Sequence, residues 1–483
     1  MPVQRTYLSR RSFMLSSTAA TAFWARAAAQ PSGEWDGPAV VRKLYLGGRP
    51  SWPRPDLDLA QEVAAIEGQM SELERRYPGK IRFTGGETVN SAEEMDAWLA
   101  RPDPSDAVLV FPMITITYPQ LRRLVATEKP VLMFSFPYNG HDWTHGAAFM
   151  QKGARLQLIA SSDPTALDPY VPLVRTIHHL KHSKVLLMST RTARPKTEAY
   201  TKQFGTTFGF PAYAELAGLY DAADAGTAER LADEFIRAAS KVVEPTREEI
   251  VKSLRLHLAI QALMRKEQAN AIAIDCLGGF GRKELPAYPC ISFSKLNDVG
   301  MYGVCENDVE STMTQLLVTS FSGRPGFVSD PVFDTSRNEV IHAHCVSATK
   351  LKGVDGEASP YMVRSHLEDH KGASMQVLAP SGEPVTVAKF ADAKRLMISN
   401  GEALGNVDNE RGCRTKIRTR VRDGEKLLAN WGATLTPGPG MPGTRDLLHR
   451  VVFYGDYMKE TAKLGRLLGF QVIDEGAETA RTD

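Results

Sequence analysis

The feature that most limits the fold of this chain is a set of short, continuous apolar runs that alternate with amphipathic helical patterns. Residues 107–111 and 131–136 are two such runs, and apolar strands between helices are typical of parallel sheets covered on both faces. Ahead of them, Ser91 and Glu94 have the spacing of a capping box. An apolar stripe with the 4-3-4-3-4 spacing of a helix comprises Leu59, Val63, Ile66, Met70, Leu73 and Tyr77. We therefore predict a flavodoxin-like α/β domain over residues 38–162.

The same alternation continues after residue 163, which predicts a second α/β domain. Residues 185–188 and 271–274 are its apolar strand candidates. Thr246 and Glu249 predict the capped start of a long helix that ends near Gln268. We place this central domain at residues 163–335, with a parallel sheet of the same flavodoxin-like kind.

The pattern changes near residue 335, beyond which short apolar runs are separated by turn residues. A final helix near residues 457–468 ends at Gly469. The runs predict strands at 340–346, 375–378, 385–390, 395–399 and 416–421. We therefore expect a β-rich, barrel-like domain over residues 336–483 behind the two α/β domains.

The N-terminus carries an export pattern. Ser9-Arg10-Arg11-Ser12-Phe13-Met14 is followed by a modestly apolar run, and Ala27-Ala28-Ala29 supplies small residues for cleavage. We predict that residues 1–29 form a twin-arginine signal peptide and that the protein is periplasmic or secreted. The run is too short and too polar to span a bilayer, so no membrane span is expected in the mature protein.

Composition narrows the class of partner. The net charge of +2 gives no reason to expect nucleic acid or a membrane surface, and 43% hydrophobic residues are ample for sizeable cores. The five cysteines are odd in number, and none precedes Cys276. A disulfide framework is therefore not expected, although a single bridge stays open.

Two acidic residues flank one predicted helix. Glu306 stands just ahead of it, and Asp330 ends the short strand that follows it. The helix itself is predicted from Val309, Met313, Leu316, Leu317 and Phe321, with Gly323 and Pro325 at its end. Two carboxylates held close together repel unless a proton or a metal ion lies between them. The sequence therefore predicts a divalent-metal site, which His344 or His449 would complete.

Several short motifs occur in one order from the central domain to the C-terminus. They are Pro289-Cys290, Leu296-Asn297-Asp298-Val299-Gly300, Cys305-Glu306-Asn307-Asp308, Gly323-Arg324-Pro325, Asp330, His342-Ala343-His344-Cys345, Gly412-Cys413-Arg414-Thr415, His449 and Tyr454-Gly455-Asp456. This set resembles the L-fucose/L-arabinose isomerase superfamily, most strongly from about residue 270 onward. The first domain is similar only in architecture. The family's usual C-E-G-D appears here with Asn307 in place of glycine.

The resemblance implies a metal-dependent aldose–ketose isomerase that acts on a small sugar and assembles as a homo-oligomer. In the fucose branch the ligands of a divalent ion, typically manganese, would be Glu306, Asp330 and His449. In the arabinose branch a further histidine joins them, for which His344 fits best and His342 is the rival. The two histidines are expected on one face of a strand, because they are two residues apart.

The chemistry can be argued from the residue types. Moving a carbonyl from C1 to C2 requires the removal of a proton beside a carbonyl. A carboxylate can take and return this proton, and a divalent cation can stabilise the resulting enediolate. Oxygen-rich ligands with imidazole suit Mn²⁺ or Mg²⁺ better than zinc. The same chemistry would serve an epimerase, or a lyase or hydrolase on a modified or keto-sugar glycoside. A sugar-binding relative without turnover is the remaining alternative.

Two further groups of histidines are weaker candidates. Trp143, His141 and His145 follow the predicted strand at 131–136, where loops of a parallel sheet bind ligands. They would either contact the sugar or belong to a surface loop without such a role, and the surface loop is the favoured interpretation. The resemblance implies that such loops reach the site of a neighbouring subunit. Three histidines on one predicted helix, His178, His179 and His182, indicate a solvated basic face rather than a metal site.

Overall fold

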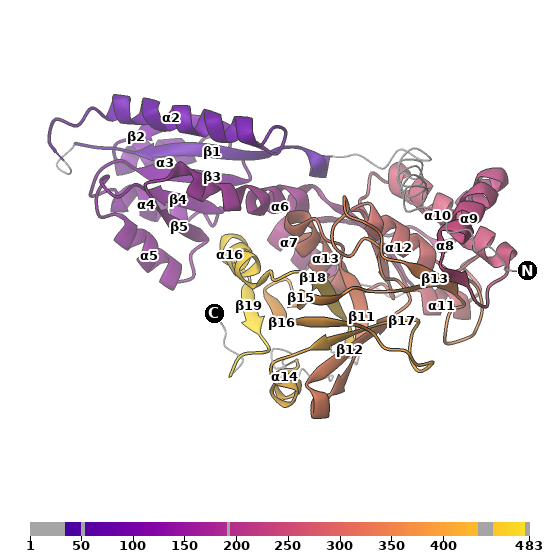
Figure 1. Cartoon of the computed structure of the whole chain (residues 1–483). Helices are drawn as coiled ribbons and strands as arrows, with labels where there is room; N and C mark the ends of the chain where they lie inside the picture. Colours follow the sequence, from indigo (N-terminus) through magenta and orange to yellow (C-terminus); the bar gives the residue numbers. More distant parts are fainter. Residues whose placement is uncertain (1–33, 50–53, 191–193, 433–447, 479–483) are drawn as a thin grey trace, which may run out of the picture.

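The computed structural model describes residues 34–49, 54–190, 194–432 and 448–478 (Figure 1). The predicted signal peptide, residues 1–29, lies outside these ranges. A first parallel sheet forms one end of the molecule, and a second parallel sheet and a large antiparallel sheet form the other (Figure 1). This arrangement confirms the predicted mixed α/β fold with a barrel-like C-terminal part. Over the described ranges, no helix combines the length and apolar character needed to cross a membrane.

The first sheet has the strand order β2-β1-β3-β4-β5, which is the flavodoxin order. All of its pairings are parallel. The strands are β1 (Ala39–Leu46), β2 (Ile81–Val89), β3 (Ala107–Pro112), β4 (Val131–Ser135) and β5 (Leu156–Ala160). The helices are η1 (Glu34–Asp36), α2 (Leu59–Arg76), α3 (Ala92–Leu99), α4 (Tyr118–Val125), α5 (Trp143–Gln151) and η2 (Pro164–Tyr170). The apolar stripe and both apolar runs therefore form the predicted elements.

The start of α3 differs from the predicted capping box by one position. The Glu94 N–H donates to Ser91 Oγ at 3.2 Å, as expected. The Glu94 carboxylate, however, accepts the N–H of Asn90 at 2.8 Å. The helix still begins where the pattern places it, because Ser91 caps its first turn.

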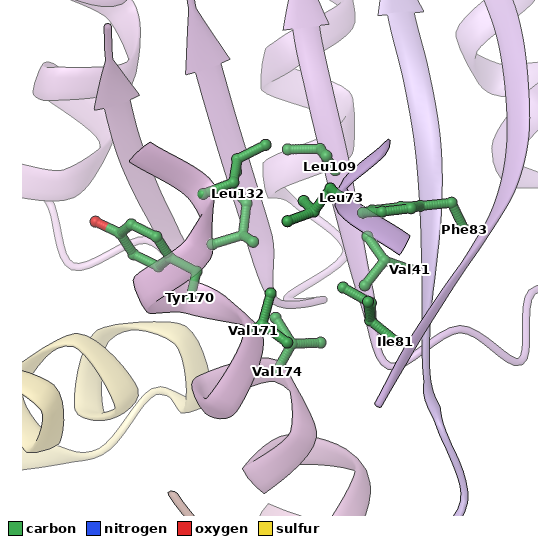
Figure 2. A pocket seen from close by; sticks show the side chains of 10 residues that line it. Val41, Leu73, Ile81, Phe83, Leu109, Leu132, Tyr170, Val171 and Val174 are labelled. Carbon is green, nitrogen blue, oxygen red and sulfur yellow. The ribbon is translucent and has the colours of Figure 1, made fainter. Parts of the chain in front are cut away.

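The core of this domain contains a small void between the sheet, α2, η2 and α6 (Figure 2). Its volume is about 10 Å³, the space of roughly one water molecule. The side chains that line it are Val41, Leu73, Ile81, Phe83, Leu109, Leu132, Leu167, Tyr170, Val171 and Val174. Because this lining is apolar, the void is a feature of packing and not a ligand site.

Helix α6 (Val171–His182) leads from the first domain to the second parallel sheet, whose order is β7-β6-β9-β10. Its strands are β6 (Lys184–Met188), β7 (Thr207–Gly209), β9 (Ala271–Ile274) and β10 (Tyr302–Cys305). Its helices are α7 (Arg194–Phe204), α8 (Tyr213–Ala222), α9 (Ala225–Ala238), α10 (Arg247–Lys266), α11 (Cys276–Gly281), α12 (Cys290–Asp298) and α13 (Val309–Ser322). The capping box of Thr246 and Glu249 is present at α10.

The large sheet has the order β15-β18-β11-β12-β17-β16-β19, and β15 also pairs with β16. The strands are β11 (Phe327–Asp334), β12 (Glu339–His344), β15 (Ser381–Asp392), β16 (Arg395–Asn406), β17 (Thr415–Arg420), β18 (Arg450–Tyr454) and β19 (Gln471–Asp474). Around it lie η3 (Thr335–Arg337), α14 (Gly424–Asn430) and α16 (Met458–Leu468). As predicted, α16 ends at Gly469, whose φ of 72° is left-handed.

Two details differ from the prediction. Strand β11 belongs to the large sheet, so this sheet starts before the predicted domain boundary at residue 336, and Asp330 lies within the strand instead of at its end. The predicted strand at 375–378 forms β14 (Ser374–Val377), outside the barrel. It pairs with β13 (Tyr361–Arg364), which pairs with β8 (Lys241–Val242) of the central region. Strand periodicity gives strand type but not pairing partner.

Candidate metal centre

Sheet register brings Asp330, His344 and His449 together. Strand β11 lies between β12 and β18. Asp330 is opposite Ala343, the neighbour of His344, and Ser329 is opposite Arg450, the neighbour of His449. Glu306 arrives from a different sheet, directly after β10. Three elements of the barrel and one end of the parallel sheet therefore meet at one point.

The functional atoms lie within a few ångströms of one another. His449 Nε2 is 3.2 Å from Asp330 Oδ1 and 3.8 Å from Glu306 Oε2. His344 Nε2 is 3.7 Å from Glu306 Oε1. The ligand atoms of Asp330, His344 and His449 all lie within 4.8 Å of one another. The four side chains singled out in the sequence thus converge.

Three of these atoms are buried without a hydrogen bond of acceptable geometry. They are Asp330 Oδ1, His344 Nε2 and His449 Nε2. Leaving a buried polar atom unpaired costs about 1–3 kcal/mol, so three that face one another point to a missing partner. A divalent cation fits, because two carboxylates and an imidazole are the donors that Mn²⁺ and Mg²⁺ accept.

Asp308 and Lys389 complete the surroundings of His449, and sequence reasoning missed both roles. Asp308 Oδ2 lies 2.7 Å from His449 Nδ1 and 2.9 Å from Lys389 Nζ. Asp308 Oδ1 also accepts the Ser311 N–H at 2.8 Å, which caps α13. Burial raises the pKa of Asp308, but Lys389 and His449 outweigh burial and hold the pKa well below its usual range. Asp308 is therefore a permanent carboxylate that orients the ring.

The hydrogen bonds of the two rings give them different roles. His449 donates its Nδ1–H to the Asp308 carboxylate, so in the neutral ring the Nε2 lone pair is directed at the site. His344 Nδ1 accepts the Cys345 N–H at 2.9 Å, so the proton of the neutral ring is on Nε2. The geometry therefore fits His449 as a metal ligand and His344 as a hydrogen-bond donor into the site.

His342, the rival of His344, is occupied on both sides. Its Nδ1 is 3.2 Å from Ser329 Oγ, and its Nε2 is 3.1 Å from Thr419 Oγ1. Burial lowers the pKa of His342 to about 3, so the ring is neutral. Because hydroxyl groups engage both nitrogens, neither is directed at the metal centre.

The charges of the site are strongly coupled. Burial raises the pKa of Glu306 and Asp330, but the two imidazoles outweigh it and lower both pKa values. Burial lowers the pKa of His344 and His449, but the neighbouring carboxylates outweigh it and raise both, that of His449 to about 9. The site thus attracts positive charge, which a proton or a cation can supply.

The backbone that presents Glu306 is strained. Glu306 and Asn307 have φ values of 59° and 54°, which are left-handed conformations that cost non-glycine residues about 1 kcal/mol or more each. The Asn307 N–H is held by the Ile274 carbonyl at 3.1 Å. Asparagine tolerates this conformation better than most residues other than glycine, so Asn307 suits this position of the turn.

Access to the centre is on the side of the carboxylates. The Asp330 and Glu306 side chains are 27% and 15% exposed, whereas those of His344 and His449 are 5% and 1% exposed. A molecule that reaches the centre from solvent therefore meets the two carboxylates first.

The loop with Trp143, His141 and His145 is not part of this cluster within the chain. It lies at the first sheet, and α5, which begins at Trp143, is far from β11 and β12 in Figure 1. Trp143 is 46% exposed. Buried Asp142 holds the loop by accepting the Ile116 and Thr117 N–H groups at 3.2 and 2.6 Å. A role for this loop at the centre would need a second copy of the chain.

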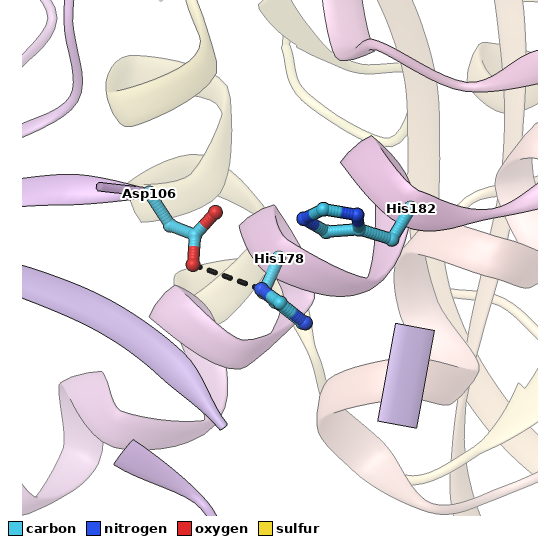
Figure 3. Close-up of side chains that lie close together, drawn as sticks. All are labelled: Asp106, His178 and His182. Atoms are coloured by element: carbon cyan, nitrogen blue, oxygen red, sulfur yellow. Dashed lines mark hydrogen bonds and ion pairs between the residues drawn. The ribbon is translucent and has the colours of Figure 1, made fainter. Parts of the chain in front are cut away.

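A second cluster, Asp106, His178 and His182, joins the start of β3 to α6 (Figure 3). The prediction of a solvated basic face is wrong for His178, which is buried and 2.9 Å from Asp106 Oδ2. Lys181 Nζ lies 3.2 Å from Asp106 Oδ1. Because this ammonium already supplies positive charge to the carboxylate, the cluster forms an ion-paired joint rather than a cation site.

A comparison of the chain with models of protein families matched none of them, and a comparison with curated proteins found no match either. The resemblance drawn from the motifs therefore stays a prediction.

Proposed function

We propose that this protein is a divalent-metal-dependent isomerase that interconverts an aldose and a ketose. The observation that carries the proposal is the convergence of three unpartnered buried atoms, Asp330 Oδ1, His344 Nε2 and His449 Nε2, beside the Glu306 carboxylate. Glu306, Asp330 and His449 would hold Mn²⁺ or Mg²⁺. When bound, the ion supplies the Lewis acidity that stabilises the negative charge of an enediolate.

The remaining chemistry belongs to the side chains. The exposed edges of Glu306 and Asp330 face the approaching sugar, and either carboxylate can take a proton from one carbon and return it to the next. His344 can donate its Nε2–H to a substrate oxygen, because its Nδ1 already accepts a backbone bond. Asp308 holds the His449 ring in one orientation.

The test combines metal analysis with a panel of aldoses. The metal-free protein and the protein with Mn²⁺ are each incubated with the sugars, and ketose is measured. We expect metal-dependent ketose formation, with loss of bound Mn²⁺ and of activity in Glu306→Gln and Asp330→Asn. Asp334→Asn is the matched control, because Asp334 lies on the same strand but bonds Ser336.

Three results would count against the proposal. Full Mn²⁺ occupancy in both site variants contradicts the ligand assignment. Cleavage of a glycoside without isomerisation favours a lyase or hydrolase. Saturable sugar binding without any product favours a binding protein.

A further inference from the structure

All five cysteines of the chain gather in one apolar cluster that adjoins the candidate metal centre. Cys276, Cys290, Cys305 and Cys345 are buried in it, and Cys413 packs against it. Two of them directly precede or follow site residues, since Cys305 is next to Glu306 and Cys345 is next to His344. This cluster cannot be predicted from the sequence, because the cysteines are spread from residue 276 to residue 413.

One pair stands out by its distance. The Sγ atoms of Cys276 and Cys305 are 3.0 Å apart, and both side chains are buried. A disulfide bond has an S–S distance of about 2.04 Å, so the two atoms need to close by about 1 Å. We infer that Cys276 and Cys305 form a disulfide bond, the single bridge that the cysteine count leaves open.

The backbone positions suit such a bond. Cys305 is the last residue of β10, and its register partner on the neighbouring parallel strand β9 is Ile274, two residues before Cys276. The two sulfur atoms therefore meet where these neighbouring strands end, 3.0 Å apart. Neither strand has to move to another register to make the bond.

The bond would support the strained turn that presents Glu306. One contact already ties this turn to the end of β9, because the Asn307 N–H donates to the Ile274 carbonyl. A covalent link from Cys276 to Cys305 adds a second constraint directly before Glu306. The left-handed backbone of Glu306 and Asn307 then has less freedom to relax.

Formation of the bond is a two-electron oxidation, for which another disulfide can serve as the oxidant. Each thiol loses its proton, the two sulfurs form one bond, and two electrons pass to the oxidant through a mixed disulfide. Oxidised glutathione accepts these electrons and leaves as two thiols. The inference does not depend on sugar chemistry, so its failure and the failure of the proposed function are separate results.

The test counts thiols and maps the link. The full chain is equilibrated with oxidised glutathione, both in the folded state and during refolding from denaturant, so that burial of the sulfurs cannot by itself prevent reaction. It is then denatured, alkylated without reductant and digested. We expect three of the five cysteines to be alkylated, and one cross-linked peptide pair that contains Cys276 and Cys305. The thermal midpoint of this form should exceed that of the reduced protein by on the order of 5 °C.

Variants separate this pair from the rest of the cluster. Cys276→Ser and Cys305→Ser should each abolish the cross-linked peptide and the oxidant-dependent rise in thermal midpoint. Cys290→Ser, which removes a buried cysteine of the same cluster, should keep both. Five alkylated cysteines under both conditions, or a link mapped only to another pair such as Cys345 and Cys413, would overturn the inference.

Discussion

At the scale of single residues, the charge around His449 decides what the centre holds. The ring lies between two carboxylates, Asp308 and Asp330, and beside Glu306, with the Lys389 ammonium bonded to Asp308. The motif predicted Glu306, Asp330 and His449. It did not predict Asp308 or Lys389, because the bond from Asp308 to His449 joins positions 141 residues apart. Asp308 and His449 become neighbours only in the folded chain.

The first prediction concerns the pH dependence of the metal-free protein. The pKa of His449 is about 9 in the folded chain and 6.5 in the ordinary case. A raised folded-state pKa gives stability that is fully present below pH 6.5 and is lost as the pH rises through about 9. We expect the free energy of unfolding in chelator to fall by on the order of 1–3 kcal/mol between these pH values.

Urea unfolding at both ends of this range measures the loss. The control is His449→Gln, a ring-free variant that cannot titrate and should lose most of the slope. If wild type and variant show the same slope, His449 is not the titrating group.

The second prediction concerns Asp308. Asp308→Asn keeps an oxygen for the Ser311 N–H but removes the carboxylate that orients His449. Loss of such a partner usually weakens metal binding by about 10–100-fold, and we expect that loss in a Mn²⁺ titration. Glu310→Gln is the matched control, because Glu310 is on the same helical turn and pairs with Lys196 at 2.9 Å. Equal affinities of Asp308→Asn and wild type would contradict the role.

At the scale of elements, the strand β10 sets the position of Glu306. Apolar runs predicted the strands of the parallel sheets well, because a strand buried on both faces must be apolar throughout. They did not place β11 in the barrel or β14 outside it, since pairing depends on contacts between distant segments. The close approach of β10 to α12 could not be predicted from the sequence either, because it depends on a single glycine, Gly303.

The third prediction tests this approach. A Cβ at Gly303 would lie 2.6 Å from Phe293 Cα. This is a backbone atom, so no change of side-chain rotamer can relieve the clash. We expect Gly303→Ala to lower the free energy of unfolding by about 1–3 kcal/mol, measured by denaturant titration. A Cβ at Gly281 meets nothing within 4 Å, so Gly281→Ala should be nearly neutral. Comparable effects of the two substitutions would show that β10 can move away from α12.

At the scale of the whole molecule, the candidate metal centre lies where two sheets meet. Glu306 follows a strand of the second parallel sheet, whereas Asp330 and His344 belong to the large antiparallel sheet and His449 directly precedes its strand β18. The order of the domains could be predicted from the sequence. The contact between the end of β10 and the strands of the large sheet could not. Any ligand that bridges the two sheets binds only the folded chain and therefore stabilises it.

The fourth prediction follows from this bridge. Mn²⁺ at about 100 times its dissociation constant adds roughly 2.7 kcal/mol to the stability, which corresponds to a rise in thermal midpoint of roughly 3 °C for a chain of this length. Scanning calorimetry with and without chelator measures it. Asp330→Asn should lose the rise and Asp334→Asn should keep it. A rise that persists in Asp330→Asn would place the ion elsewhere.

The extra pairing of β15 with β16 has a consequence for how copies of this chain can meet. It turns six strands of the large sheet into a ring, and β19 lies outside this ring alongside β16. A closed ring offers no row of unpaired amides and carbonyls to an incoming strand. Over the described residues, self-assembly through these six strands must therefore use side-chain surfaces, which interface mutations can dissect without breaking the barrel.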